Sequence, residues 1–141
     1  MRILLTNDDG LGAPGLLELE AKSAALGSCV VVAPSQERSG AGHSLTMHEP
    51  LRVSPHGADR WACTGTPVDC VYVALHKLFD GPPDLVISGI NRGANLGDDV
   101  FYSGTVGAAR EAALNGLQAL AVSLDLSSGP AVSECHFTTA S

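Results

Sequence analysis

Aromatic residues are scarce in this chain of 141 residues. The sequence contains one Trp, two Tyr and three Phe, which together make 4% of it. A protein that binds single-stranded nucleic acid by stacking needs a series of aromatic side chains. The composition therefore argues against a stacking platform for bases. It favours a core of Leu, Val, Ile and Ala, as in buried parallel strands packed against helices.

Positive charge is also in short supply. Lys and Arg number 8 against 15 Asp and Glu, so the formal net charge is -7. Duplex nucleic acid and anionic membranes both attract basic surfaces, and we expect neither as a partner. An acidic protein can still bind phosphate where a metal ion supplies local positive charge.

The sequence lacks long apolar runs and a metal-binding cysteine pattern. No stretch approaches the roughly 20 apolar residues of a membrane span. The apolar run after Met1 is short for a signal peptide and is typical of a first strand. Cys29, Cys63, Cys70 and Cys135 form no CxxC pair and no zinc-like group. We therefore expect reduced, buried thiols in a cytoplasmic protein.

What the chain does contain is an alternation of strand and helix patterns. We predict strands at 2–6, 29–33, 84–88 and 117–124, helices at 14–26, 66–79 and 105–115, and a hairpin of 51–54 with 60–64. In the first helix, Leu16, Leu19 and Leu26 would share one face, with Gly27 as the stop signal. A glycine-rich loop is expected over 89–104. The fold class is α/β, a doubly wound, mainly parallel, Rossmann-like sheet with a small β-hairpin. We expect residues 1–141 to form a single domain.

Polar loops follow three of the predicted strands, at residues 7–10, 35–40 and 88–93. Ligands of open α/β sheets bind beyond the carboxyl ends of the strands, so these loops should converge. They offer two carboxylates, a hydroxyl and an amide, an oxygen-only set that suits Mg²⁺, Mn²⁺ or Ca²⁺ and not zinc. The alternatives are a helix-capping turn at Asp8 and Asp9, a turn serine at Ser39 and a left-handed turn residue at Asn91.

A second polar segment, at residues 102–107, begins the predicted helix over 105–115. It brings hydroxyls and a glycine to a helix start, where free backbone N–H groups and the helix dipole favour an anion. We interpret it as a phosphate seat, with a simple Ser or Thr helix cap as the alternative. The preceding loop has neither GxGxxG spacing nor the GK[ST] of a P-loop.

Five segments, in this order and spacing, resemble the SurE family of stationary-phase survival proteins. They are Asn7-Asp8-Asp9-Gly10, Arg38-Ser39-Gly40, Gly65-Thr66-Pro67-Val68-Asp69-Cys70, the run from Ser88 to Asp99, and Tyr102-Ser103-Gly104-Thr105-Val106. The resemblance extends from residue 1 to about residue 137. No single segment is decisive, but the ordered set is specific.

The resemblance implies a metal-dependent 5′/3′-nucleotidase, a phosphomonoesterase that releases phosphate from nucleoside monophosphates. The residues that match the metal ligands of the family are Asp8, Asp9, Ser39 and Asn91. Those that match its phosphate pocket are Asn95, Ser103, Gly104 and Thr105. The resemblance also implies a Mg²⁺ or Mn²⁺ cofactor, activity on short polyphosphate, and assembly as a homodimer or homotetramer.

For the chemistry, we expect Asp8 and Asp9 to be the catalytic residues. One of them would orient or deprotonate the attacking water. Direct attack by an aspartate, giving a phospho-enzyme, is the competing route. His43 could approach the phosphate or donate a proton, with a packing histidine as the alternative.

Members of the family continue well beyond the length of this chain, so we expect a domain truncated at its C-terminus. This keeps two alternatives open: a non-catalytic nucleotide- or metal-binding module, and an inactive fragment with an exposed sheet edge. A glycosyltransferase could also use paired acids to hold a metal and a nucleotide. It would need an acceptor domain that 141 residues do not supply.

Overall fold

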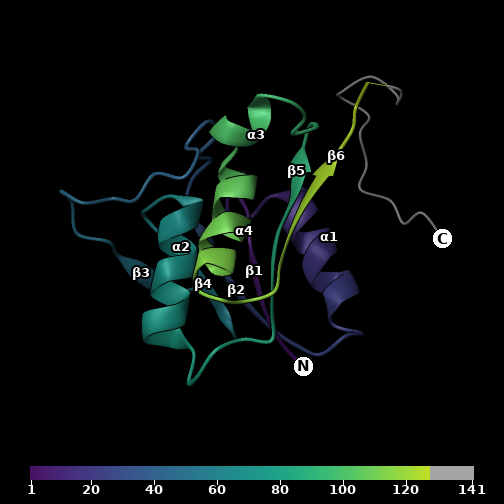
Figure 1. Cartoon of the computed structure of the whole chain (residues 1–141). Helices are drawn as coiled ribbons and strands as arrows, with labels where there is room; N and C mark the ends of the chain where they lie inside the picture. The colour runs from purple at the N-terminus through teal and green to yellow at the C-terminus, as the bar shows by residue number, and fades with distance from the viewer. Residues whose placement is uncertain (128–141) are drawn as a thin grey trace.

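The computed structural model describes residues 1–127, which form a six-stranded sheet with helices on both faces (Figure 1). The prediction that concerns Cys135 lies outside the described residues. The strands are β1 (Arg2–Thr6), β2 (Ser28–Pro34), β3 (Val53–Pro55), β4 (Arg60–Cys63), β5 (Leu85–Arg92) and β6 (Ala119–Leu124). The helices are α1 (Pro14–Ser23), α2 (Pro67–Val73), the π-helical turn η1 (Ala74–Leu78), α3 (Asp99–Tyr102) and α4 (Gly104–Leu114).

The strand order is β3-β4-β2-β1-β5-β6. All neighbouring pairs are parallel except β3 with β4, which form the antiparallel hairpin that the sequence predicts. From β1 the chain builds outward through β2 on one side, and it returns to place β5 on the other side of β1. The doubly wound α/β fold is therefore confirmed, with its topological switch point between β1 and β5.

Alternating side chains of the central strands divide the core into two layers. Ile3 and Leu5 pack with Leu16 and Leu19 of α1, whereas Leu4 faces the cluster under α2 and α4. Successive residues of a strand point to opposite faces of the sheet. Because helices cover both faces of this parallel sheet, the short strands are nearly continuous apolar runs in the sequence. Leu26 does not belong to either layer: α1 ends at Ser23 and Leu26 is 57% exposed, so the prediction that it shares a helix face with Leu16 and Leu19 was wrong.

Strand β5 runs four residues further than predicted, to Arg92, through residues assigned to a loop. Its register with β6 shifts between Ser88 and Asn91, so the extension pairs again after an irregularity. Gly89 lies in that irregular stretch, and a Cβ there would collide with the carbonyl oxygen of Val122. A glycine is therefore needed at this point of β5, because the backbone of β6 approaches it too closely for a side chain.

The predicted helix over 66–79 divides into α2 and η1. Thr66 caps α2: its Oγ1 accepts from the Asp69 N–H, and the Asp69 carboxylate accepts from the Thr66 N–H. This reciprocal capping confirms the start predicted from the Thr-Pro sequence. Trp61 of β4 is half-buried and packs against the core on this side of the sheet.

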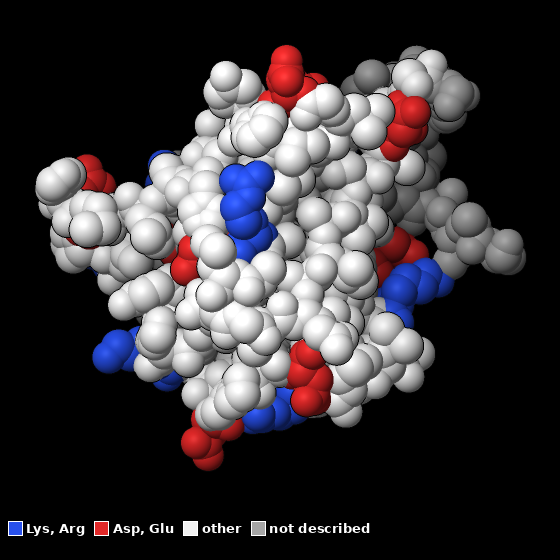
Figure 2. Space-filling view, in the orientation of Figure 1, with Lys and Arg blue, Asp and Glu red and all other residues white. Residues whose placement is uncertain are grey.

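The predicted burial of the thiols is only partly correct. Cys63 and Cys70 are buried free thiols, whereas Cys29 is half-buried, so the prediction was wrong for Cys29. On the face shown in Figure 2, Lys and Arg side chains stand apart from one another and form no basic patch. Within residues 1–127, no helix is both long enough and apolar enough to cross a bilayer.

Candidate active site

The loop after β1 is shaped by Asn7. Its buried side chain donates from Nδ2 to the Gly10 carbonyl over 2.9 Å and accepts the Gly10 N–H at Oδ1 over 3.2 Å. Gly10 has φ of 105°, a conformation that strains other residues. This closed turn holds Asp8 and Asp9 at the carboxyl end of β1. The N-cap of α1 is Ala13 with no side-chain cap, so the capping alternative for the two aspartates was wrong.

The loop after β2 is tied to the loop after β1. The Arg38 backbone N–H donates to the Asp8 carbonyl over 2.7 Å. Next to it, the Ser39 hydroxyl donates to the Glu37 carboxylate over 2.6 Å, and both side chains are exposed. Because its proton goes to Glu37, the Ser39 oxygen keeps lone pairs to offer to a cation.

The third contribution comes from the end of β5. Asn91 donates from Nδ2 to the Gly93 carbonyl over 2.9 Å, which leaves its Oδ1 as an acceptor. Asn91 lies within the strand, and Asp59 is the one non-glycine residue with positive φ in the described part of the chain. The left-handed turn alternative for Asn91 was therefore wrong. The Arg92 N–H donates to Asp9 Oδ2 over 3.4 Å, linking β5 to the aspartate loop.

These loops line an open pocket of about 330 Å³ at the carboxyl ends of β1, β2 and β5. Its lining residues are Asp8, Asp9, Glu37, Ser39, Gly40, Asn91, Arg92, Asn95, Asp99, Tyr102 and Ser103. All four predicted metal ligands are in this set, and so are two of the four predicted phosphate-binding residues. The sheet geometry thus brings together side chains that are up to 95 positions apart, from Asp8 to Ser103.

Two predicted phosphate-binding residues, Gly104 and Thr105, lie behind the lining. The Thr105 Oγ1 donates to Asp8 Oδ1 over 2.8 Å, and both side chains are buried. A Cβ on Gly104 would come to 3.0 Å from the Asp8 Cβ and from Pro67 Cγ. Ser103 is the N-cap of α4 and accepts the Val106 N–H, so the capping alternative holds for it although it also lines the pocket.

Asn95 is held by a hydrogen bond from outside the pocket loops. The Ser123 hydroxyl of β6 donates to Asn95 Oδ1 over 2.7 Å. Since the amide oxygen is used in this way, the Nδ2 group is left as the donor that Asn95 can offer to a ligand. A donor at this position suits an anionic group.

The electrostatics of the pocket favour a cation. Burial raises the pKa of Asp8, an effect that the Thr105 hydrogen bond partly offsets. Burial and the neighbouring Asp8 charge raise the pKa of Asp9, and Glu37 pushes both pKa values in the same direction. The protein alone therefore leaves two close carboxylates incompletely compensated, and a divalent cation would relieve that. The oxygen donors of Asp8, Asp9, Ser39 and Asn91 fit Mg²⁺ or Mn²⁺.

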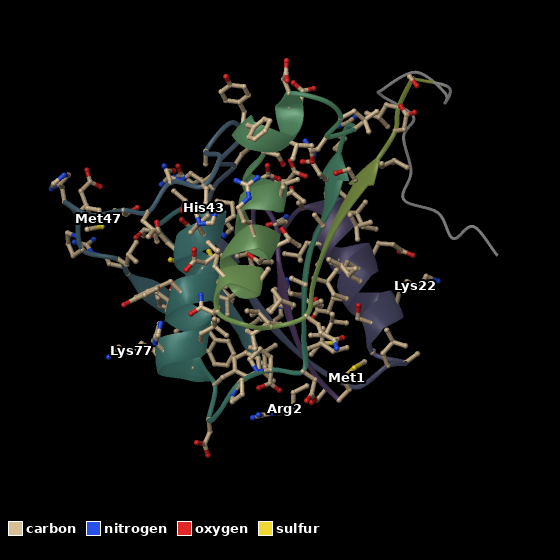
Figure 3. All side chains as sticks on the ribbon, viewed as in Figure 1. Met1, Arg2, Lys22, His43, Met47 and Lys77 are labelled. Carbon is tan, nitrogen blue, oxygen red and sulfur yellow. The ribbon has the colours of Figure 1, made fainter. Side chains whose placement is uncertain are left out.

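His43 does not line this pocket. Its Nε2 is 2.7 Å from Glu111 Oε2 on α4, and Figure 3 shows it beside the helices, whereas Met47 projects away from them. The position of His43 fits a packing histidine and does not fit a residue that contacts the phosphate.

Within residues 1–127, no three or more His, Cys, Asp or Glu side chains gather as a metal-binding group.

Sequence reasoning assigned no individual role to the lining residues Glu37 and Tyr102, and it left the role of Asp99 at the pocket rim open. Glu37 belongs to the polar loop 35–40, which the sequence predicts as part of the site. A turn over these residues could bring its carboxylate to the Ser39 hydroxyl two positions later. Asp99 and Tyr102 belong to α3, which the sequence did not predict because it lies in a glycine-rich segment. Their place at the pocket follows from the position of that helix.

The fold and the pocket define an open α/β protein with a carboxylate-lined pocket at its switch point. A model of the family described as Survival protein SurE matches residues 3–141. The chain therefore belongs to the SurE family, and the resemblance given by its motifs is confirmed.

Similar proteins carry the same family name. The chain is 57% identical over 124 residues to 5′-nucleotidase SurE of Geotalea daltonii, covering 88% of this chain and 50% of that protein. It is 58% identical over 123 residues to 5′-nucleotidase SurE of Rhodospirillum rubrum, with 86% and 47% covered. The crystal structure of the SurE protein from Aquifex aeolicus superposes with a TM-score of 0.87 at 43% identity, covering 95% of this chain and 55% of that one. The chain thus spans about half the length of the curated relatives it matches.

Proposed function

We propose that the protein is a divalent-metal-dependent phosphomonoesterase that hydrolyses nucleoside 5′- and 3′-monophosphates to nucleoside and phosphate. The observation that carries the proposal is the shared pocket: the Asp8 and Asp9 carboxylates open into the same space as Asn95 and Ser103. Carboxylates for a cation beside donors for an anion are what metal-assisted phosphate hydrolysis needs. The relatives named 5′-nucleotidase supply the substrate class. Short polyphosphate is included in the proposal as a second substrate.

The residues proposed to hold the metal are Asp8, Asp9, Ser39 and Asn91. A bound Mg²⁺ or Mn²⁺ would supply a Lewis acid for a phosphate oxygen and would ease deprotonation of water. Asn95 and Ser103 would donate hydrogen bonds to the phosphoryl oxygens, where negative charge is distributed in the transition state. Gly104 and Thr105 would contribute through the N-terminus of α4, whose dipole favours an anion.

The two aspartates would take different roles. Asp8 is buried and accepts the hydrogen bond from Thr105, whereas Asp9 is half-buried, lines the pocket and accepts a longer hydrogen bond from the Arg92 N–H. We assign Asp9 to orienting the attacking water and accepting its proton, since a base must reach the reacting group. The competing route is direct aspartyl attack. Trapping of ³²P on acid-quenched protein would establish that route, and its absence under turnover conditions supports water as the nucleophile.

A second candidate is a non-catalytic nucleotide- or metal-binding module of the same fold. It would use the same pocket and the same oxygen and amide donors, so turnover alone separates it from the enzyme. The predicted homodimer or homotetramer, the single domain over 1–141 and the cytoplasmic location stay predictions.

Phosphate release from the purified full chain tests the function. The panel would contain 5′- and 3′-nucleoside monophosphates and ribose 5-phosphate, with Mg²⁺ or Mn²⁺ and with EDTA. Metal-dependent release that is lost in Asp8→Ala is expected. Near-normal release by Asp8→Ala would contradict the site. A nucleotide sugar added to the panel tests the glycosyltransferase alternative, which release of sugar rather than phosphate would indicate. No release by folded protein would leave the binding module.

A further inference from the structure

The rim of the pocket carries an exposed aromatic ring. Tyr102 lines the pocket, yet 69% of the residue is exposed. Within the described part of the chain its hydroxyl has no hydrogen-bond partner. Exposed apolar side chains are common on protein surfaces, and what distinguishes this ring is that it lines the polar pocket.

The backbone holds this ring in place. Tyr102 is the last residue of α3 and directly precedes Ser103, the N-cap of α4. Its carbonyl accepts the Gly42 N–H over 2.9 Å, and a Cβ on Gly42 would come to 3.2 Å from the Phe101 carbonyl oxygen. Tyr102 is therefore the neighbour of Ser103, a proposed phosphate donor, and its backbone is held by α3, by the start of α4 and by the hydrogen bond from Gly42.

The segment that carries this ring also exposes two other large apolar side chains. Leu96 and Phe101, in the same connection between β5 and α4, are 70% and 68% exposed. By contrast, the charged side chains that line the pocket are Asp8, Asp9, Glu37, Asp99 and Arg92. A ligand that matches both regions carries a phosphate at one end and a flat apolar group at the other. A nucleoside monophosphate has this form, with the ribose spanning the distance between them.

We propose that Tyr102 stacks on the base of the substrate and is the residue that favours nucleoside monophosphates over other phosphate monoesters. The proposal rests on the function proposed above. The aromatic content of 4% argues against a platform for many bases, but one ring is enough for one base. An aromatic face stacks on purines and pyrimidines alike, so the selectivity is for a base and not for one particular base.

Two measurements on the full chain test this. The first is the ratio of kcat/KM for AMP to that for ribose 5-phosphate, which differs from AMP by lacking the base. The second is the Kd of adenosine, which has the base and no phosphate to be cleaved, by saturation-transfer NMR. In Tyr102→Ala we expect the ratio to fall, and the Kd to rise, by about 5- to 150-fold, the range measured for loss of one stacked base. The fall should appear mainly in KM.

Two variants provide the controls. Tyr102→Phe keeps the ring and should bind adenosine, which a role for the hydroxyl would not allow. Tyr72→Ala removes the other tyrosine, which lies on α2 and does not line the pocket. The centroid of its ring is 4.3 Å from that of the His76 ring. Tyr72→Ala should leave the ratio and the Kd at wild-type values.

The outcomes separate the stacking role from a general structural one. If Tyr102→Ala lowers kcat/KM equally for AMP and ribose 5-phosphate, Tyr102 supports the pocket generally and the proposal fails. The proposal also fails if adenosine binds neither the wild type nor Tyr102→Ala, or binds both with the same Kd. A change in subunit number by sedimentation, with an unchanged Kd for adenosine, counts as such a failure. If the wild type hydrolyses no ester, the proposed function fails on its own. Adenosine binding that depends on Tyr102 would still support the stacking role in that case.

Discussion

The buried hydroxyl of Thr105 donates a hydrogen bond to Asp8 Oδ1 over 2.8 Å, across 97 positions of the sequence. This contact joins the start of α4 to the loop after β1 and lowers the pKa of a carboxyl that burial otherwise raises. It orients Asp8 while leaving Oδ2 for another partner. The first residue of the proposed metal site is thus positioned by a residue that does not line the pocket.

Thr105→Val is expected to reduce kcat/KM by about tenfold, a loss of roughly 1.4 kcal/mol of transition-state stabilisation. Valine has nearly the shape of threonine but no hydroxyl, so Asp8 loses its donor and its pKa rises further. The acid limb of the pH–rate profile should therefore move to higher pH. Thr105→Ser keeps the hydroxyl and should restore both quantities towards wild type. An unchanged profile in Thr105→Val would show that this hydrogen bond does not matter to Asp8.

Metal binding should raise the melting temperature of the protein. A ligand that binds the folded state at 100 times its Kd stabilises it by about 2.7 kcal/mol, which is roughly 5 to 15 °C at this size. The shift with Mg²⁺ or Mn²⁺ should be lost in Asp8→Asn and in Asp9→Asn. Asp80→Asn is the matched control, because Asp80 is exposed and is not part of the pocket lining. A full shift in both pocket variants would place the metal elsewhere.

Without metal, Asp8→Asn is expected to stabilise the protein at neutral pH. The folded-state pKa of Asp8 is raised, so between the unfolded and folded pKa values the native state binds more protons than the unfolded state. The free energy of unfolding of the wild type therefore falls as pH rises through this window. Below the unfolded pKa, near 3.8, the Asp8 penalty is absent. Urea titrations in EDTA from pH 3.5 to 7.5 measure this.

The advantage of Asp8→Asn over wild type should grow from pH 3.5 to pH 7.5. The amide introduced by Asp8→Asn could still accept the Thr105 hydrogen bond through its oxygen, so the comparison isolates the charge. A variant that is less stable than wild type at pH 7.5 would mean that the Asp8 carboxylate is well compensated without a metal.

The fold was largely predictable because its strands are short, apolar and bounded by strong turn signals. Residues 2–6 precede Asn-Asp-Asp-Gly, and β2 is β-branched and ends at Pro34. Once these strands are parallel, their carboxyl ends must share one edge of the sheet. That argument brings Asp8, Asp9, Ser39 and Asn91 to one place without any structural information, and the pocket contains all four.

What the sequence did not predict depends on contacts between distant segments. The extension of β5 passes through Gly89, a residue that local propensity assigns to a loop, and only its pairing with β6 makes it a strand. Tyr102 was part of a recognised motif but had no role until α3 was seen at the pocket rim. Gly104 was interpreted as part of an anion seat, and its packing against Asp8 was not foreseen.

Gly104→Ala tests whether the close approach of α4 to Asp8 is needed. The added Cβ would lie 3.0 Å from both the Asp8 Cβ and Pro67 Cγ, tighter than ordinary van der Waals contact. Overpacking of this kind costs about 1–3 kcal/mol of stability, and here the displaced group is a proposed catalytic residue. We expect a lower melting temperature and a fall of about tenfold or more in kcat/KM.

Gly12→Ala is the matched control for this substitution. Gly12 is exposed in the same part of the chain as the aspartate loop, has no positive φ, and nothing lies within 4 Å of its added Cβ. It should change neither quantity. If Gly104→Ala lowers the melting temperature but leaves kcat/KM intact, the packing at Gly104 serves only stability. If it changes neither, α4 can shift away from Asp8 without consequence, and the Thr105 hydrogen bond alone must position the carboxylate.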